Sequence, residues 1–395
     1  MKLSQRITHL TGGGGDGWDV FYRARRMVSE GHAVTELTIG EHDIRTDPSI
    51  LGAMETSARD GHTGYAMVPG TDMLRDTVAA RVQMRSGIPT TRKNVLITPG
   101  GQAGLFAAHM AVCDPGDVGL YLDPYYATYP GTIRGAGAIA RAVATTAEDA
   151  FQPRAESIEA AADGAVSLLI NTPNNPTGVV YSRQTLENIA DLCKRRDLWL
   201  ISDEVYDTQV WQGAHLSPRA LPGMADQTLV VGSMSKSHAM TGSRCGWIVG
   251  PEEVIDHFIN LATHTTYGVP GFIQDAASFA LNAGTVLEED IAAPFRRRRA
   301  LAMDLLAAQN TVGLVPAQGA MYVMLDVRAT GLSGEGFANA LLDTHSIAVM
   351  PGESFGKAAA GHVRVAMTID DERFASALKT LCEFAATLAD CQAAE

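Results

Sequence analysis

The chain has 395 residues, of which 46% are hydrophobic and 19% are charged. A chain of this length exceeds the size at which one hydrophobic core usually stops growing, so we expect one large and one smaller domain. The formal net charge of −13 argues against a nucleic acid or an anionic membrane as a partner, because such surfaces are bound through a basic footprint.

Cysteine usage and the N-terminal composition bear on the compartment. The five cysteines include no CxxC pair, which is typical of free thiols in a reducing cytosol. The first residues lack the apolar run of a signal peptide, and no segment approaches the roughly 20 apolar residues that span a bilayer. We therefore expect a cytoplasmic protein with no membrane partner and no metal site.

Residues 12–17, Gly-Gly-Gly-Gly-Asp-Gly, form a low-complexity stretch near the N-terminus. A glycine-rich loop that binds phosphate needs a strand before it and a helix N-terminus after it. Only a polar segment precedes these glycines, so we predict a flexible arm or hinge.

The middle of the chain alternates short apolar runs with helical patterns. Helices are predicted at residues 102–113 and 185–196. Strands are predicted at residues 94–98, 119–122, 166–171, 199–202, 228–232 and 246–249. Most of these runs are continuously hydrophobic, as expected for strands buried on both faces, and the alternation with helices predicts a mainly parallel sheet covered by helices.

The pattern changes after about Ile291. We predict a long helix that begins near Pro294, a strand at residues 321–326, a helix from Ser333, and strands near Ile347 and Val363. This order is typical of a second, α+β domain.

Polar residues follow three successive predicted strands. These strand ends carry Asn175, Asp203 with Tyr206, and Lys236, and ligands of open parallel sheets bind at this edge. After an earlier strand, the turn at residues 99–102 opens a helix whose free N–H groups suit a phosphate. Each feature alone is commonly a turn, a helix cap or a surface lysine. Together they are what pyridoxal 5′-phosphate (PLP) requires: a Schiff-base lysine and a carboxylate for the pyridine nitrogen.

At these residues the sequence resembles the fold-type-I, class I aminotransferases across nearly its whole length. The resemblance implies a three-layer PLP-binding domain with a mainly parallel sheet at residues 46–290. It also implies a smaller α+β domain at residues 291–395, joined by the N-terminal arm at 1–45, and a homodimer. The matching pieces are Leu37-Thr38-Ile39-Gly40-Glu41, Gly64-Tyr65, Gly100-Gly101-Gln102, Asp123-Pro124-Tyr125-Tyr126, Asn174-Asn175-Pro176-Thr177-Gly178, Ser202-Asp203-Glu204-Val205-Tyr206, Ser233-Met234-Ser235-Lys236, Gly242-Ser243-Arg244 and Val363-Arg364-Val365.

The resemblance also implies a role for each matching position. Lys236 would hold PLP as a Schiff base and move the proton, Asp203 would pair with the pyridine nitrogen, and Arg364 would bind the substrate α-carboxylate. The others would complete the site: Tyr206 and Asn175 at the 3′-oxygen, Tyr126 on the ring, Gly101, Gln102, Ser233 and Arg244 at the phosphate, Tyr65 at the neighbouring subunit's phosphate, and Gly40 with Asn175 beside the substrate.

The implied reaction exchanges the amino group of an L-amino acid with the carbonyl of a 2-oxo acid. Stretches around Leu221–Asp226, Ser235–Gly242 and Tyr267–Ala277 resemble the arginine:pyruvate transaminase-like branch, which implies arginine with pyruvate. An aspartate-type or broad-specificity aminotransferase is the alternative, followed by a PLP lyase. A regulatory PLP-binding domain is disfavoured, because no basic segment precedes residue 30.

Some positions depart from the family pattern. His42 stands where many members have Pro, Ile44 where they have Phe, and Ser243 where Trp is common. For the distal end of the substrate, Asp16, Trp18 and Asp19 would suit a guanidinium group. The alternative is that Trp18 anchors the arm by burial.

Overall fold

The computed structural model describes residues 1–13 and 17–393. Of the glycine-rich stretch 12–17, residues 14–16 lie outside the described residues, so its flexibility stays a prediction.

The larger sheet has seven strands in the order β2-β8-β7-β6-β5-β3-β4. The strands β4, β3, β5, β6 and β7 are parallel, whereas β8 runs antiparallel to both β7 and β2. The bounds are β2 (Val95–Thr98), β3 (Val118–Asp123), β4 (Ile139–Ala144), β5 (Ala165–Asn171), β6 (Trp199–Asp203), β7 (Thr228–Ser233) and β8 (Gly246–Val249). Six of them coincide closely with predicted strands, and the mainly parallel α/β class is confirmed.

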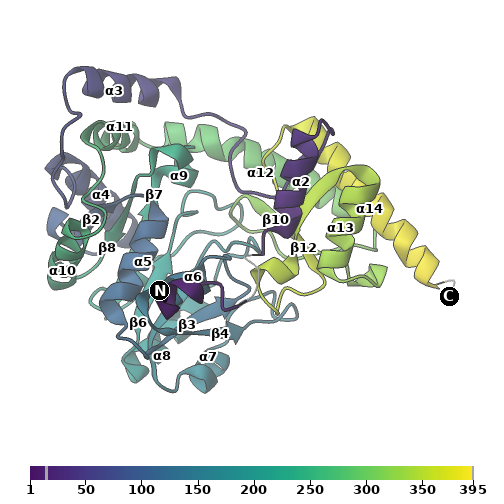
Figure 1. Cartoon of the computed structure of the whole chain (residues 1–395), viewed down its shortest axis with the longest axis horizontal. Helices are drawn as coiled ribbons and strands as arrows, with labels where there is room; N and C mark the ends of the chain where they lie inside the picture. The colour runs from purple at the N-terminus through teal and green to yellow at the C-terminus, as the bar shows by residue number, and fades with distance from the viewer. Residues whose placement is uncertain (14–16, 394–395) are drawn as a thin grey trace.

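Helices cover both faces of this sheet and form three layers with it (Figure 1). Alternate residues of one strand enter different cores: Leu229 packs on one face and Val230 on the other. The face of Leu229 is covered by α5 (Gly101–Val112), α6 (Tyr129–Ala136) and α10 (Glu252–Thr263), and the opposite face by α3 (Pro48–Arg59), α4 (Asp72–Ser86), α8 (Arg183–Arg196), α7 (Ala155–Ala161) and α11 (Gly271–Asn282).

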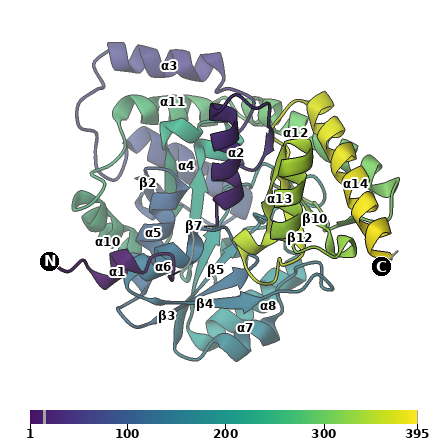
Figure 2. The same ribbon diagram turned by 45° about the vertical axis from the view of Figure 1, so that its right-hand side comes forward.

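The smaller sheet has the order β1-β11-β12-β10-β9 and joins both ends of the chain. The N-terminal β1 pairs in parallel with β11, and α2 packs beside α13 (Figure 2). The bounds are α1 (Gln5–Thr8), α2 (Asp19–Ser29), β1 (Thr35–Leu37), β9 (Gly313–Leu314), β10 (Tyr322–Asp326), α13 (Gly334–His345), β11 (Ile347–Pro351), β12 (His362–Ala366) and α14 (Asp371–Ala393). We propose that residues 46–290 form the large domain, since all strands of the larger sheet lie within this range.

The prediction that the long helix begins near Pro294 was wrong. Helix α12 spans Val286–Ala307 and contains Pro294 in its interior. Glu288 and Glu289 in its first turn suit a helix N-terminus. Buried Ile291 and Phe295 anchor it on either side of the proline, so packing outweighs the missing hydrogen bond. The proposed boundary at residue 290 therefore falls within a continuous helix.

The length and composition of the helices show whether one of them could span a membrane. Over residues 1–13 and 17–393, none of the helices is long and apolar enough to cross a bilayer.

Candidate active site

A cavity of about 360 Å³ lies at the carboxyl ends of β5, β6 and β7. All of the predicted site residues except Tyr65 line it: Gly40, Gly101, Gln102, Tyr126, Asn175, Asp203, Tyr206, Ser233, Lys236, Arg244 and Arg364. These residues come together because parallel strands end at the same edge of the sheet.

At one end, backbone and hydroxyl donors form a cradle. Gly101 begins α5, so the first N–H groups of this helix have no partner within it. Gly100 has a φ of 78°, and a Cβ there would stand 2.3 Å from Arg244 Nη2. Ser233 Oγ lies 2.9 Å from Ser235 Oγ, and both line the cavity. Helix N-terminus, hydroxyls and guanidinium together suit a phosphate.

A buried carboxylate stands at the other end. Asp203 ends β6, and its Oδ2 accepts a 2.7 Å hydrogen bond from Tyr129 Oη. Its Oδ1 accepts from Val205 N at 3.3 Å. Burial raises the pKa of Asp203 to about 6, while the bond from Tyr129 acts to lower it. A buried carboxylate like this can stabilise a cation that enters the cavity.

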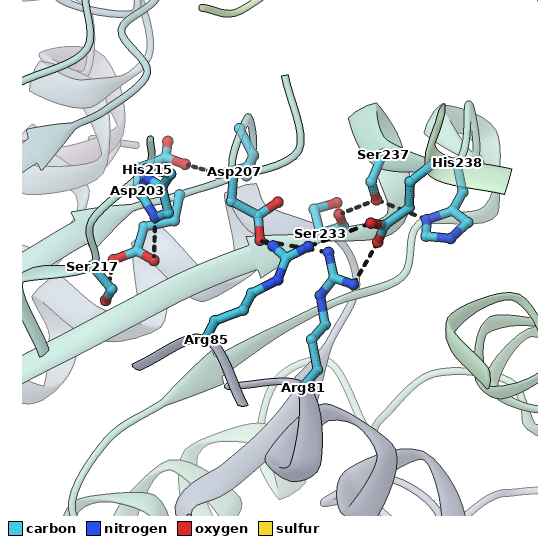
Figure 3. Close-up of polar contacts among 12 residues, drawn as sticks. Arg81, Arg85, Asp203, Asp207, His215, Ser217, Ser233, Ser237 and His238 are labelled. Atoms are coloured by element: carbon cyan, nitrogen blue, oxygen red, sulfur yellow. Dashed lines mark hydrogen bonds and ion pairs between the residues drawn. The ribbon is translucent and has the colours of Figure 1, made fainter. Parts of the chain in front are cut away.

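An ionic cluster lies behind Asp203, on the opposite face of the sheet. Figure 3 shows Arg81 and Arg85 extending from α4 toward Asp207, with which both form ion pairs. Glu204, the residue after Asp203, pairs with His215 at 3.0 Å. The segment 203–207 is therefore held by ion pairs at both Glu204 and Asp207. A support of this kind keeps the Asp203 carboxylate in place.

Lys236 lies in the short helix α9 (Met234–Ser237), and its Nζ donates to the Gly40 carbonyl. Burial lowers the pKa of Lys236 to about 8, and the charges of Arg364 and Arg244 lower it as well, against Glu41 and Asp203. An amine with this pKa is partly neutral near physiological pH, which a nucleophile requires.

Two tyrosines connect the cavity to the smaller sheet. Tyr206 Oη lies 3.1 Å from Tyr322 Oη, and burial raises the pKa of Tyr206. A Cβ at Gly40 would stand 1.8 Å from Tyr322 Oη, so only glycine fits here. Tyr126 is half-buried and meets Tyr129 edge-on, with 5.8 Å between the ring centroids.

Arg364 reaches the cavity from β12, between the rings of Tyr322 and Phe355, each 4.3 Å from its guanidinium carbon. Nη1 donates to Asn175 Oδ1 at 2.8 Å, and Nη2 donates to the Thr38 carbonyl. Buried Nε has no partner among the described residues. A guanidinium held in this way suits a carboxylate ligand.

Two of the residues predicted for the site or the distal pocket, Tyr65 and Asp19, lie outside this cavity. Tyr65 is 91% exposed, outside the cavity, and meets Tyr267 edge-on at 5.3 Å. Asp19 is exposed at the start of α2, and Asp16 is outside the described residues. Trp18, in contrast, lines the cavity.

Sequence reasoning missed Tyr129, Ser235 and Tyr322 as lining residues. Tyr129 is the first residue of α6, and Tyr126 precedes that helix, so helical spacing could not have revealed it. No local pattern indicates Tyr322.

PLP fits the donor set of this cavity. The cradle at Gly101, Ser233, Ser235 and Arg244 suits its phosphate, and Asp203 suits its pyridine nitrogen. Lys236 Nζ suits its aldehyde. Arg244 lies so close to Gly100, and Tyr322 so close to Gly40, that neither position has room for a side chain.

Comparisons with known proteins agree with this chemistry. The model of the aminotransferase class I and II family matches residues 33–381. The arginine–pyruvate transaminase AruH of Pseudomonas aeruginosa is 40% identical over 391 residues, covering 98% of this chain and 99% of the relative. The aspartate/prephenate aminotransferase of Thermus thermophilus is 34% identical, over 90% of this chain and 92% of the relative. A solved aspartate aminotransferase of Thermus thermophilus (a double mutant) superposes with a TM-score of 0.91 at 32% identity, covering 97% of this chain and 99% of that chain.

The family match and the cavity's donor set lead to one conclusion. The chain belongs to the class I and II aminotransferases and uses PLP to exchange the amino group of an amino acid with the carbonyl of a 2-oxo acid.

Proposed function

We propose that the enzyme transfers the amino group of L-arginine to pyruvate. The observation that carries this proposal is the set of charges around the cavity. Three cations line it, Lys236, Arg244 and Arg364, and two carboxylates, Glu41 and Asp203.

Each of these cations already has a function in the proposed site. We assign Lys236 to the cofactor aldehyde, Arg244 to the phosphate and Arg364 to the substrate α-carboxylate. Among the described lining residues no cation remains for a second carboxylate. A dicarboxylic substrate such as aspartate would therefore leave its distal charge unpaired in a partly buried site, which is costly.

A cationic distal group meets better partners. Glu41 is exposed at the cavity, where its Oε1 accepts from Thr241 Oγ1 at 3.3 Å. The indole of Trp18 lines the same cavity. A guanidinium can pair with a carboxylate and stack on an aromatic face. Asp19 lies outside the cavity, so Glu41 replaces it in this proposal.

The acceptor follows from the same charges. Pyruvate has one carboxylate, which Arg364 can bind, and a methyl group that needs no charged partner. The similarity to an arginine–pyruvate transaminase supports this pair. Similarity to aspartate aminotransferases favours the alternative, an aspartate-type or broad-specificity enzyme.

Each predicted lining residue has a proposed role in the reaction. Bound PLP withdraws electrons from the substrate α-carbon. Asp203 keeps the pyridine nitrogen protonated, and Lys236 Nζ moves the proton at the α-carbon. Tyr206 and Asn175 would donate to the 3′-oxygen, Tyr126 would lie against the ring, and Gln102 would join the phosphate donors. Arg364 fixes the α-carboxylate with help from Gly40 and Asn175.

A substrate panel tests the proposed pair. With pyruvate as acceptor, we expect kcat/KM for arginine to exceed that for aspartate by about 100-fold, the cost of an unpaired buried charge. With arginine as donor, kcat/KM for pyruvate should exceed kcat/KM for 2-oxoglutarate. Trp18→Ala should raise KM for arginine more than for alanine, and Asp19→Ala serves as the matched exposed control. Equal or faster turnover of aspartate would refute the proposal.

We also propose a homodimer in which Tyr65 serves the neighbouring subunit's phosphate. Tyr65 is 91% exposed, Met67 66% and Tyr267 52%, a concentration of exposed apolar surface that favours an interface. Dilution should release PLP and activity together, which sedimentation and absorbance would measure. A fully active monomer would contradict the shared site.

A further inference from the structure

His42 contacts the reactive lysine without lining the cavity. Its Nε2 lies 3.0 Å from the main-chain carbonyl oxygen of Lys236. Since a carbonyl oxygen only accepts, Nε2 must carry the hydrogen. Nδ1 is buried and has no hydrogen-bond partner among the described residues.

The His42 ring stays neutral at working pH. Burial and the positive charge of Lys236 lower the pKa of His42 to about 3, although the bond to the Lys236 carbonyl and the charge of Asp43 oppose this. The ring meets Phe295 of α12 edge-on, with 5.5 Å between centroids. A neutral, enclosed imidazole acts here as a hydrogen-bond donor and not as a proton carrier.

A second side chain donates to the same carbonyl. Gln209 Nε2 lies 3.1 Å from the Lys236 oxygen. Lys236 sits in a helix of four residues, whose carbonyl groups have few partners within so short an element. Two donors from distant parts of the chain therefore supply the hydrogen bonds to the Lys236 carbonyl that the short helix does not.

The segment that carries His42 is fixed along residues 40–46. Thr46 Oγ1 donates to the Ala239 carbonyl at 2.6 Å. Asp43 pairs with Arg298 of α12 at 2.7 Å. The segment thus joins the loop that follows Lys236 to the helix that leads into the smaller sheet.

We propose that His42 is a positioning residue for Lys236: its Nε2–H holds the carbonyl of the lysine and so fixes the main chain from which the reactive amine projects. The proposal rests on the assignment of Lys236 to the cofactor.

Two variants separate the hydrogen bond from the packing of the ring. His42→Met and His42→Gln both remove the imidazole and its contact with Phe295, but glutamine keeps an N–H donor of similar reach. In His42→Met we expect faster hydrogen exchange of residues 234–241, in protein with and without PLP. We also expect kcat to fall about three- to tenfold, the worth of one hydrogen bond, with KM changed less than about twofold. His42→Gln should restore both to near wild type.

Two further variants keep the test decisive. His109→Met removes another buried histidine, whose Nδ1 bonds the Leu105 carbonyl at 2.9 Å, and should leave exchange at residues 234–241 unchanged. Gln209→Met removes the second donor and should accelerate that exchange even if His42→Met does not fold. Identical exchange and kcat in His42→Gln and His42→Met would overturn the proposal, as would wild-type exchange at residues 234–241 in His42→Met. The exchange measurement needs no substrate, so its outcome is independent of whether arginine is the donor.

Discussion

Removal of one hydroxyl should change the ionisation of the cofactor's carboxylate partner. Tyr129 Oη donates to buried Asp203 Oδ2 at 2.7 Å and acts to lower the pKa of that carboxyl. A hydrogen bond to a charged group contributes about 1.5–3 kcal/mol, and one pKa unit corresponds to about 1.4 kcal/mol. Tyr129→Phe should therefore raise the pKa of Asp203 by about 1 to 2.

The sign of this change determines the pH dependence. A higher pKa keeps Asp203 protonated over a wider acid range, and the protonated form cannot hold a cationic pyridine nitrogen. The acid limb of kcat/KM should move upward by about 1 to 2 pH units in Tyr129→Phe, and the two enzymes should converge at high pH.

Initial rates from pH 5.5 to 9.5 would measure this change. Tyr181→Phe removes a hydroxyl from a tyrosine that is buried in another core and does not line the cavity, so its acid limb should match wild type. A ratio of Tyr129→Phe to wild type that is independent of pH would refute the reasoning.

Three other outcomes are expected. Lys236→Ala should lack the absorbance of lysine-bound cofactor and abolish transamination, so wild-type turnover would exclude the assigned nucleophile. Asp203→Asn should retain PLP while kcat falls by a factor on the order of 10²–10³, and near-normal turnover would exclude its role. Because the pKa of Lys236 is lowered to about 8, stopped-flow capture of PLP by the apo-protein should accelerate with pH and level off above about 8. A rate that still rises tenfold per unit at pH 9.5 would contradict the lowered pKa.

The sequence predicts the strands of the larger sheet because burial on both faces leaves continuous apolar runs. Strand β4 was missed because it lacks this burial. It lies at the sheet edge, Ile139 is 54% exposed, and most of its residues are polar or small. The antiparallel insertion of β8 between β7 and β2 was not predicted either. Strand order depends on contacts that connect distant segments, and local periodicity carries no information about them.

The same distinction applies to the active site. Asn175, Asp203 and Lys236 were predictable because each follows a parallel strand, and such strands end at one edge. Tyr322 comes from the smaller sheet, and His42 from the segment leading to α3. Tyr206 and Tyr322 are separated by 116 residues, yet their hydroxyls lie 3.1 Å apart. Contacts of this kind arise only when the second sheet packs over the first. The residues that define the cofactor's chemistry could therefore be predicted from strand ends, while those that position them become evident only in the folded chain.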